Sequence, residues 1–364
     1  MKKISRMAQV LSWALSTMLM AVPSTLAEGK QVRAAFVYVS PVNDAGWTRA
    51  HDDARKAMMD LPYVETAFRA SVPEDADVEQ VLNEFVQQGY NLIFTTSYGY
   101  MDATAKVAEE NPDLVFMHCS GSKTSQNMGT YFGHMYQPRY VSGIVAGHMT
   151  RSNILGFVAA FPIPEVIRGI NAFALGVRSV NPEAKVHVIW TDTWYDPAKE
   201  FAAADRLLDM GADVIAQHQD TPYPQQAAEA RGAFSIGYNT DMSAMAPKAH
   251  LTAAVWNWGP YYRQIAEQFH NGTWKPESYW GTMRNGVVDV APYGDMVPQN
   301  VRAEAEAAKA RIISGDWDVF YGPVKDQSGN VRVAEGEKMS DADMLTLNWF
   351  VEGVVGQIPE AAKH

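Results

Sequence analysis

Cysteine is almost absent from this chain of 364 residues, whose only cysteine is Cys119. A single cysteine can form neither an internal disulfide nor a cysteine-based zinc site. We therefore expect Cys119 to be a small apolar residue at the end of a buried strand. We expect no metal and no cofactor.

Positive charge is also scarce. The chain has 30 Lys and Arg residues against 41 Asp and Glu, which gives a net charge of −11. A protein that binds nucleic acid needs a basic face to neutralise the phosphates. We therefore expect no nucleic-acid partner.

Common catalytic motifs are missing as well. The sequence has no G-x-S-x-G elbow, no H-E-x-x-H pair and no G-x-x-x-x-G-K phosphate loop. The run His51-Asp52-Asp53 resembles a metal cluster, but adjacent helix residues face different directions, so we expect a solvated helix face there. These absences favour a binding protein over an enzyme.

A long uncharged apolar run occurs only at the start of the chain. Three basic residues lie within the first six positions, residues 7–22 are mostly apolar, and Thr25-Leu26-Ala27 supplies small residues. This pattern is typical of an export signal cleaved near Ala27, whereas a membrane span needs about 20 apolar residues. We expect a periplasmic protein that is monomeric, does not insert into the membrane after signal removal, and carries a net charge of −14.

After this segment, short apolar runs alternate with amphipathic ones. The run from Val32 to Val39 is rich in β-branched and aromatic residues and ends at Ser40-Pro41, as in a buried strand of a parallel sheet. Such strands alternating with helices of 10–15 residues indicate βαβ units and an α/β fold. Further strands are expected at 91–95, 114–118, 154–160, 185–190, 214–217, 234–238, 251–255 and 286–290, and a final helix at 341–355.

Two lobes are indicated by length and by a weak internal repeat. About 337 residues remain after the signal, more than one core usually supports. Segment 85–94 resembles segment 207–216, and in each an amphipathic helix ends at a glycine suited to a left-handed cap, Gly89 or Gly211. We predict a signal peptide at 1–27, a first lobe at 28–150 completed by about 256–295, and a second lobe at 151–255 completed by about 300–364.

The loops after the predicted strands are rich in aromatic residues. Ligands of open α/β sheets bind at the carboxyl ends of the strands. Aromatic rings there suit a flat, partly apolar ligand held by stacking and by hydrogen bonds at its rim. The rings are those of Trp47, Tyr98, Tyr100, Phe161, Trp194, Tyr195, Tyr223, Trp256 and Trp258.

Five segments carry a family pattern by their order and spacing: Asn43–Trp47, Gly143–Gly147, Ile154–Ala160, Thr193–Lys199 and Gly237–Asp241. Together they resemble the basic membrane protein family of ABC-transporter substrate-binding proteins, to which the purine nucleoside receptors belong. The resemblance implies the type I periplasmic-binding fold, in which two Rossmann-like lobes joined by crossing strands close over a ligand. It also implies an inner-membrane ABC permease as the partner.

The same resemblance implies a site for a purine-type ligand. Trp47 and Trp194 take the two positions whose aromatic rings stack on the base. Edge hydrogen bonds are expected from Asn43, Thr48, Ser120, Asp220 and Asn239, with Tyr98 and Trp256 as walls of the pocket. The family's ribose-contacting Gly-Val-Asp-x-Asp segment reads Gly237-Tyr-Asn-Thr-Asp241 here, so a free nucleobase fits the sequence as well as a nucleoside.

Two other functions stay open. The first is a receptor for another small polar solute, a sugar or an amino-acid derivative. An amino acid would call for a carboxylate-binding arginine, and the candidates Arg49 and Arg168 are expected on helix surfaces. The second is a secreted nucleoside hydrolase, which would need a cluster of aspartates near the first strand, where only Asp44 occurs.

Overall fold

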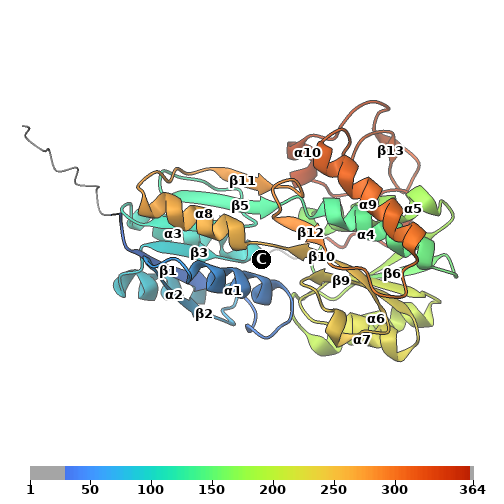
Figure 1. The fold of residues 1–364 in the computed structure, drawn as a ribbon, viewed down its shortest axis with the longest axis horizontal. Coiled ribbons are helices and arrows are strands. Elements are labelled where there is room, and N and C mark those ends of the chain that lie inside the picture. Colours follow the sequence, from blue (N-terminus) through green and yellow to red (C-terminus); the bar gives the residue numbers. More distant parts are fainter. Residues whose placement is uncertain (1–28, 361–364) are drawn as a thin grey trace, which may run out of the picture.

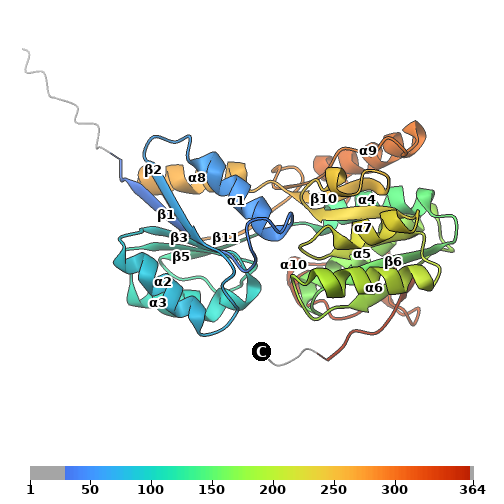
Figure 2. The ribbon, with the colours of Figure 1, turned by 90° about the horizontal axis from the view of Figure 1, so that it is seen from below.

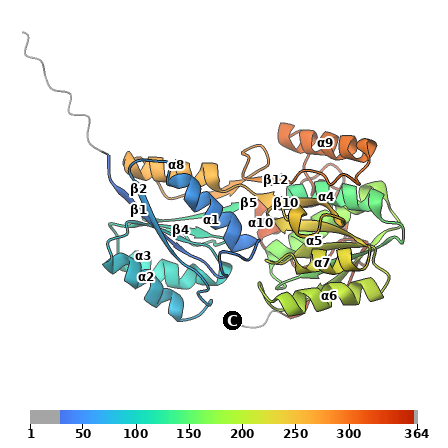
Figure 3. The ribbon, with the colours of Figure 1, turned by 60° about the horizontal axis from the view of Figure 1, so that its bottom comes forward.

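The computed structural model of the protein describes residues 29–360 and contains two large sheets (Figure 1). The first sheet has the strand order β11-β5-β4-β3-β1-β2, and all its pairings are parallel. Helices α1 and α8 cover one face, and α2 and α3 cover the other (Figures 2 and 3). The bounds are β1 Val32–Val37, β2 Val64–Arg69, β3 Leu92–Thr95, β4 Val115–Cys119, β5 Met128–Gly133, β11 Ser278–Gly281, α1 Trp47–Met58, α2 Asp77–Gln87, α3 Met101–Glu110 and α8 Gly259–His270.

The second sheet has the strand order β12-β10-β9-β8-β6-β7-β15, and only its β10–β12 pairing is antiparallel. Helix α4 packs against α5 and α9, whereas α6 packs against α7. The bounds are β6 Ile154–Ala159, β7 Lys185–Trp190, β8 Val214–His218, β9 Phe234–Asn239, β10 His250–Trp256, β12 Val288–Val290, β15 Val354–Val355, α4 Tyr136–Met149, α5 Pro164–Val180, α6 Pro197–Asp209, α7 Tyr223–Ala230, α9 Gln299–Ser314 and α10 Asp341–Leu345; β13 Val324–Lys325 and β14 Val331–Val333 form a separate hairpin.

The chain passes between the two sheets three times. It leaves the first sheet after β5, returns after β10 and leaves again after β11. The predicted alternation of strands and helices is confirmed, as is the burial of Cys119 at the end of β4.

The internal repeat is confirmed at its two glycines. Gly89 has a φ of +80° and Gly211 a φ of +95°, a left-handed conformation that residues with a side chain rarely adopt. Each glycine lies two residues after the end of a helix, α2 or α6, and the next strand, β3 or β8, begins three residues later. Both turns therefore start a strand whose carboxyl end faces the space between the sheets.

The division into lobes at 150–153 stays a prediction. Helix α4 lies before that turn, yet it packs against α5 and β10 of the second sheet. We therefore propose that the first crossing lies earlier, between Gly133 and Tyr136.

The predicted final helix at 341–355 is wrong. Only α10 is helical, and the chain then runs extended into β15, which pairs with β7. The Asn171 side chain donates to the Trp349 carbonyl oxygen at 2.8 Å and accepts from the Val351 N–H at 3.0 Å. Tertiary hydrogen bonds thus satisfy backbone groups that a helix would otherwise pair.

The predicted solvated face at 51–53 is wrong for His51 and Asp52, which are buried. His51 Nδ1 lies 2.6 Å from the Tyr262 hydroxyl of α8, and Asp52 pairs with Arg55 at 2.8 Å. These residues hold α1 in place. Within residues 29–360, no group of three or more His, Cys, Asp and Glu side chains is placed to hold a metal ion.

Two further points concern the membrane. In the part of the chain that the structure describes, no helix has the length and apolar character to cross a bilayer. The predicted export signal at 1–27 lies outside the described residues.

Candidate functional site

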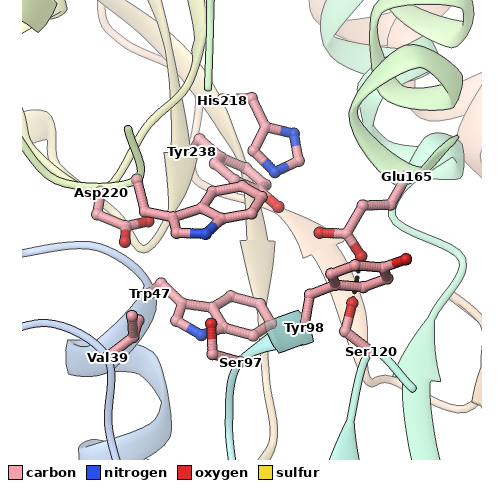
Figure 4. Close-up of a pocket in the computed structure, with 10 residues that line it drawn as sticks. Val39, Trp47, Ser97, Tyr98, Ser120, Glu165, His218, Asp220 and Tyr238 are labelled. Carbon is pink, nitrogen blue, oxygen red and sulfur yellow. Dashed lines mark hydrogen bonds between the residues drawn. The ribbon is translucent and has the colours of Figure 1, made fainter. Parts of the chain in front are cut away.

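A narrow pocket with about 20 Å³ of free space lies between the two sheets, where their strands end (Figure 4). This free space is far smaller than that of small-molecule sites, which span about 300–1,000 Å³, so the two sides of the pocket lie close together. The first sheet and its loops contribute Val39, Trp47, Ser97, Tyr98 and Ser120; the second contributes Glu165, Trp194, His218, Asp220 and Tyr238.

Trp47 is the first residue of α1, and the Asp44 carboxylate fixes the start of that helix. Asp44 accepts hydrogen bonds from the backbone N–H groups of Gly46, Thr48 and Arg49 at 2.8, 2.9 and 3.0 Å. These are the donors that a helix start leaves without partners. The position of Trp47 is therefore set by the helix that it begins.

The Trp47 indole is half-buried and is held from behind. The rings of His51 and Trp256 meet it nearly edge-on, with centroids 4.4 and 5.6 Å away. Its Nε1 donates to the Thr96 carbonyl oxygen at the end of β3. These contacts orient the ring while it lines the pocket.

Trp194 lies in the loop after β7 and lines the pocket from the second sheet. Its ring meets the Phe161 ring at 63°, with centroids 4.9 Å apart. Its Nε1 donates to Glu74 Oε2 at 3.2 Å. Glu74 lies between β2 and α2, so this hydrogen bond joins the two sides of the pocket.

Ser120 and Glu165 form a second link across the pocket. The Ser120 hydroxyl, just after β4, donates a short hydrogen bond to Glu165 in the first turn of α5, and Figure 4 shows the pair beside Tyr98. Burial raises the pKa of Glu165 to about 7, although the Ser120 hydrogen bond and the nearby Arg168 act in the opposite direction. Near neutral pH this carboxyl can therefore either accept or donate.

Asp220 is the other carboxyl group of the pocket and is 4 % exposed. It accepts from the Ser40 hydroxyl at 3.3 Å and from the Asn239 side-chain amide at 3.2 Å. Burial, and then the charges of Asp44 and Glu200, raise its pKa well above the usual range for an aspartate.

His218 and Tyr238 form the inner wall, where their ring centroids lie 4.4 Å apart. The Arg139 guanidinium covers the Tyr238 ring at 3.8 Å. Burial and the charges of Arg139 and Arg168 hold the pKa of His218 well below its usual range, so its imidazole is neutral at physiological pH.

The structure brings five of the nine predicted ligand-binding residues to this pocket: Trp47, Tyr98, Ser120, Trp194 and Asp220. The other four lie elsewhere. Asn43 is exposed, and the fully buried Thr48 hydroxyl accepts from the Ser40 N–H at 3.3 Å. Asn239 accepts from Trp256 Nε1 at 3.0 Å, so both residues lie behind the lining residues. Direct ligand contact by any of the nine stays a prediction.

Sequence reasoning missed five lining residues: Val39, Ser97, Glu165, His218 and Tyr238. A signal was present for Glu165 and His218. Glu165 follows directly on a loop expected at a strand end, and His218 ends strand β8. A lone histidine in a sequence is more often structural than functional, so His218 was not predicted to lie at the pocket.

Comparisons with known proteins agree with this geometry. The family model described as PnrA-like ABC transporter substrate-binding protein matches residues 31–319. A purine-binding protein of Brucella abortus is 43 % identical to this chain, over 91 % of this chain and 95 % of its own length. A putative ABC transporter glucose-binding protein of Haloferax volcanii is 41 % identical, over 91 % of this chain and 82 % of its own length. A solute-binding protein of an ABC transporter system from Aeropyrum pernix superposes with a TM-score of 0.70 at 16 % identity, covering 81 % of this chain and 93 % of its own. This structural likeness confirms the predicted type I periplasmic-binding fold.

Proposed function

The chain belongs to the PnrA-like family of ABC transporter substrate-binding proteins, and we propose that it captures a purine nucleobase or nucleoside between its two sheets. The observation that carries the proposal is the pair Trp47 and Trp194, which come from opposite sides and line one pocket. The Brucella abortus relative, which is named for purine binding, supports the same ligand class.

Stacking accounts for the choice of a flat ligand. Indole rings offer a large apolar face at little cost in side-chain entropy. Trp47 is held edge-on by His51 and Trp256, and Trp194 by Phe161, so neither ring has to be ordered when a base enters. Such preorganised walls raise affinity because less freedom is lost on binding.

The polar lining favours a ligand without negative charge. None of the ten lining residues is Lys or Arg, and two of them are carboxyl groups, Glu165 and Asp220. This weighs against nucleotides and against a free amino-acid carboxylate. Arg49 pairs with Asp53 at 2.7 Å, and Arg168, predicted on a helix surface, is buried and donates to the Met344 carbonyl oxygen at 2.6 Å.

Glucose is the second candidate ligand. A relative 41 % identical to this chain carries the name of a putative glucose-binding protein. Carboxylates suit sugar hydroxyls, and an indole can cover one face of a pyranose. Two indoles in one pocket favour the base, because a planar ring offers both of its faces to stacking.

Capture proceeds by closure of two lobes around the ligand. Contacts that only a closed form can make already join the two sides, among them Ser120 to Glu165 and Trp194 to Glu74. We propose that the protein acts as a monomer in the periplasm, hands its ligand to an inner-membrane ABC permease and catalyses nothing.

Isothermal titration of the purified protein with adenine, hypoxanthine, adenosine, inosine, AMP and glucose tests the proposal. We expect binding of at least one base or nucleoside, no binding of AMP, and weaker or no binding of glucose. Incubation with adenosine or inosine should release no free base. Tight binding of glucose with no response to any purine would refute the purine assignment and leave family membership intact.

A further inference from the structure

Among the residues that line the pocket, His218 is the one imidazole. It is 5 % exposed, lies at the end of β8 and packs against Tyr238. Its ring also lies 6.1 Å from that of Trp194, between centroids. Figure 4 shows its ring between Tyr238 and Glu165, on the side of the pocket away from Trp47 and Ser97.

The buried edge of the imidazole lies near a cation. His218 Nδ1 is wholly buried and has no hydrogen-bond partner, and the same is true of Arg139 Nε and Nη2. A side-chain carbon on Gly169 would lie 3.7 Å from Arg139 Nε and 3.9 Å from His218 Nδ1, so both nitrogens border one small space. Arginine only donates, so an imidazole lone pair, and not an N–H, is favoured on that side.

A neutral imidazole that keeps a lone pair on Nδ1 carries its proton on Nε2. Nδ1 belongs to the buried edge, so Nε2 belongs to the edge that lines the pocket. Given the function proposed above, we infer that His218 is a specificity-determining hydrogen-bond donor, which selects bases that present an acceptor to its Nε2–H.

Four other donors of the lining are already committed within the protein. The Trp47 and Trp194 N–H groups donate to Thr96 and Glu74, and the Ser120 hydroxyl donates to Glu165. The Ser97 hydroxyl donates to Glu74 as well. Asp220 and Glu165 each keep a carboxyl oxygen that can accept from an N–H group of the base, and His218 provides a complementary donor.

Analogues that each lose one acceptor provide the test. In one set, ring nitrogen 1, 3 or 7 of adenine, or ring nitrogen 3 or 7 of hypoxanthine, is replaced by C–H; in another compound the 6-oxo group of hypoxanthine is replaced by hydrogen. A buried donor left without its partner should weaken binding about ten- to a hundredfold. We expect one of these changes to carry such a penalty in the unmodified protein.

Three variants test whether His218 causes this loss of affinity. His218→Phe keeps a ring of similar size but lacks the donor, so the penalty should vanish, and the parent base should bind about tenfold or more weakly. His218→Gln retains an amide donor and should keep part of the discrimination. His250→Phe is the matched control, since His250 is equally buried in the same sheet but lies outside the pocket lining; it should keep the full penalty.

Melting curves establish first that each variant folds, and His218→Leu replaces the Phe variant if it does not. A penalty of the same size in the variants that lack the His218 donor would overturn the inference. Equal affinities of the unmodified protein for the parent base and all analogues would overturn it as well. Failure of every purine to bind the unmodified protein would overturn the proposed function itself, and with it this inference, before any variant is made.

Discussion

Removal of either indole from the pocket should weaken purine binding by a predictable amount. Base–aromatic stacking is worth about 1–3 kcal/mol per base, which corresponds to roughly ten- to a hundredfold in affinity at either position. Trp47→Ala and Trp194→Ala should both show this loss, and a Phe replacement at either position should cost less because it restores a ring.

The two variants should differ in stability. Trp47 contacts Trp256 and His51 in the α1–α8 region, so its removal also disrupts core packing. Trp194 packs mainly against Phe161 in a loop, and its removal should lower the melting temperature less.

Isothermal titration with the best-bound purine measures the affinities, and calorimetric melting measures the stabilities. Trp190→Ala is the matched control, because Trp190 is a half-buried indole of β7 that packs against Phe350 away from the pocket lining. Affinities within about twofold of the unmodified protein for both pocket variants would refute the stacking account.

Four further predictions concern the pocket, its closure and the processing of the chain. Gly46→Ala should weaken ligand binding with little loss of melting temperature, because its new side-chain carbon would lie 2.3 Å from the Asp220 carbonyl oxygen across the closed pocket. Gly259→Ala is the control, since its new carbon meets only ordinary contacts; equal affinities of the two variants by titration would contradict the prediction. Burial raises the pKa of Glu165 from 4.5 to about 7, so between these pH values the folded protein holds a proton that the unfolded chain has released. The stability of the folded protein therefore falls as pH rises through this window. Glu165→Gln should melt progressively higher than the unmodified protein from pH 5 to 7, and a constant difference in melting temperature over this range would contradict the prediction. Saturation with ligand should raise the melting temperature and reduce the radius of gyration measured by small-angle scattering as the lobes close, and superimposable scattering curves would exclude closure. Exported protein should begin at or near Glu28 without a lipid, and mass spectrometry that finds Met1 intact would contradict the predicted signal.

The parts of the fold that were predictable depend on local sequence. The helix-to-strand turns at Gly89 and Gly211 were recognisable because a left-handed cap needs a residue without a side chain. The tail after residue 345 was not predictable in this way, because its backbone is held by Asn171, which is remote in sequence. Local apolar spacing suggested a helix where tertiary hydrogen bonds impose an extended chain.

The residues of the candidate site were likewise predictable only in part. Trp47, Tyr98, Ser120, Trp194 and Asp220 were placed by the rule that ligands meet strand ends and by family resemblance. His218 was not among the predicted ligand-binding residues, because the sequence around a lone histidine reveals nothing about its surroundings in the fold. The donor role that we infer for His218 depends on Arg139, which belongs to a different element and lies near His218 only in the folded protein.

The identity of the captured molecule decides whether the protein is a purine receptor. Protein purified from the periplasm without added ligand can be denatured, and the released small molecules identified by mass spectrometry. The account predicts a purine base or nucleoside at close to one molecule per chain, lost from a protein that carries both Trp47→Ala and Trp194→Ala. Release of a hexose in that amount, retained by the double variant, would contradict it.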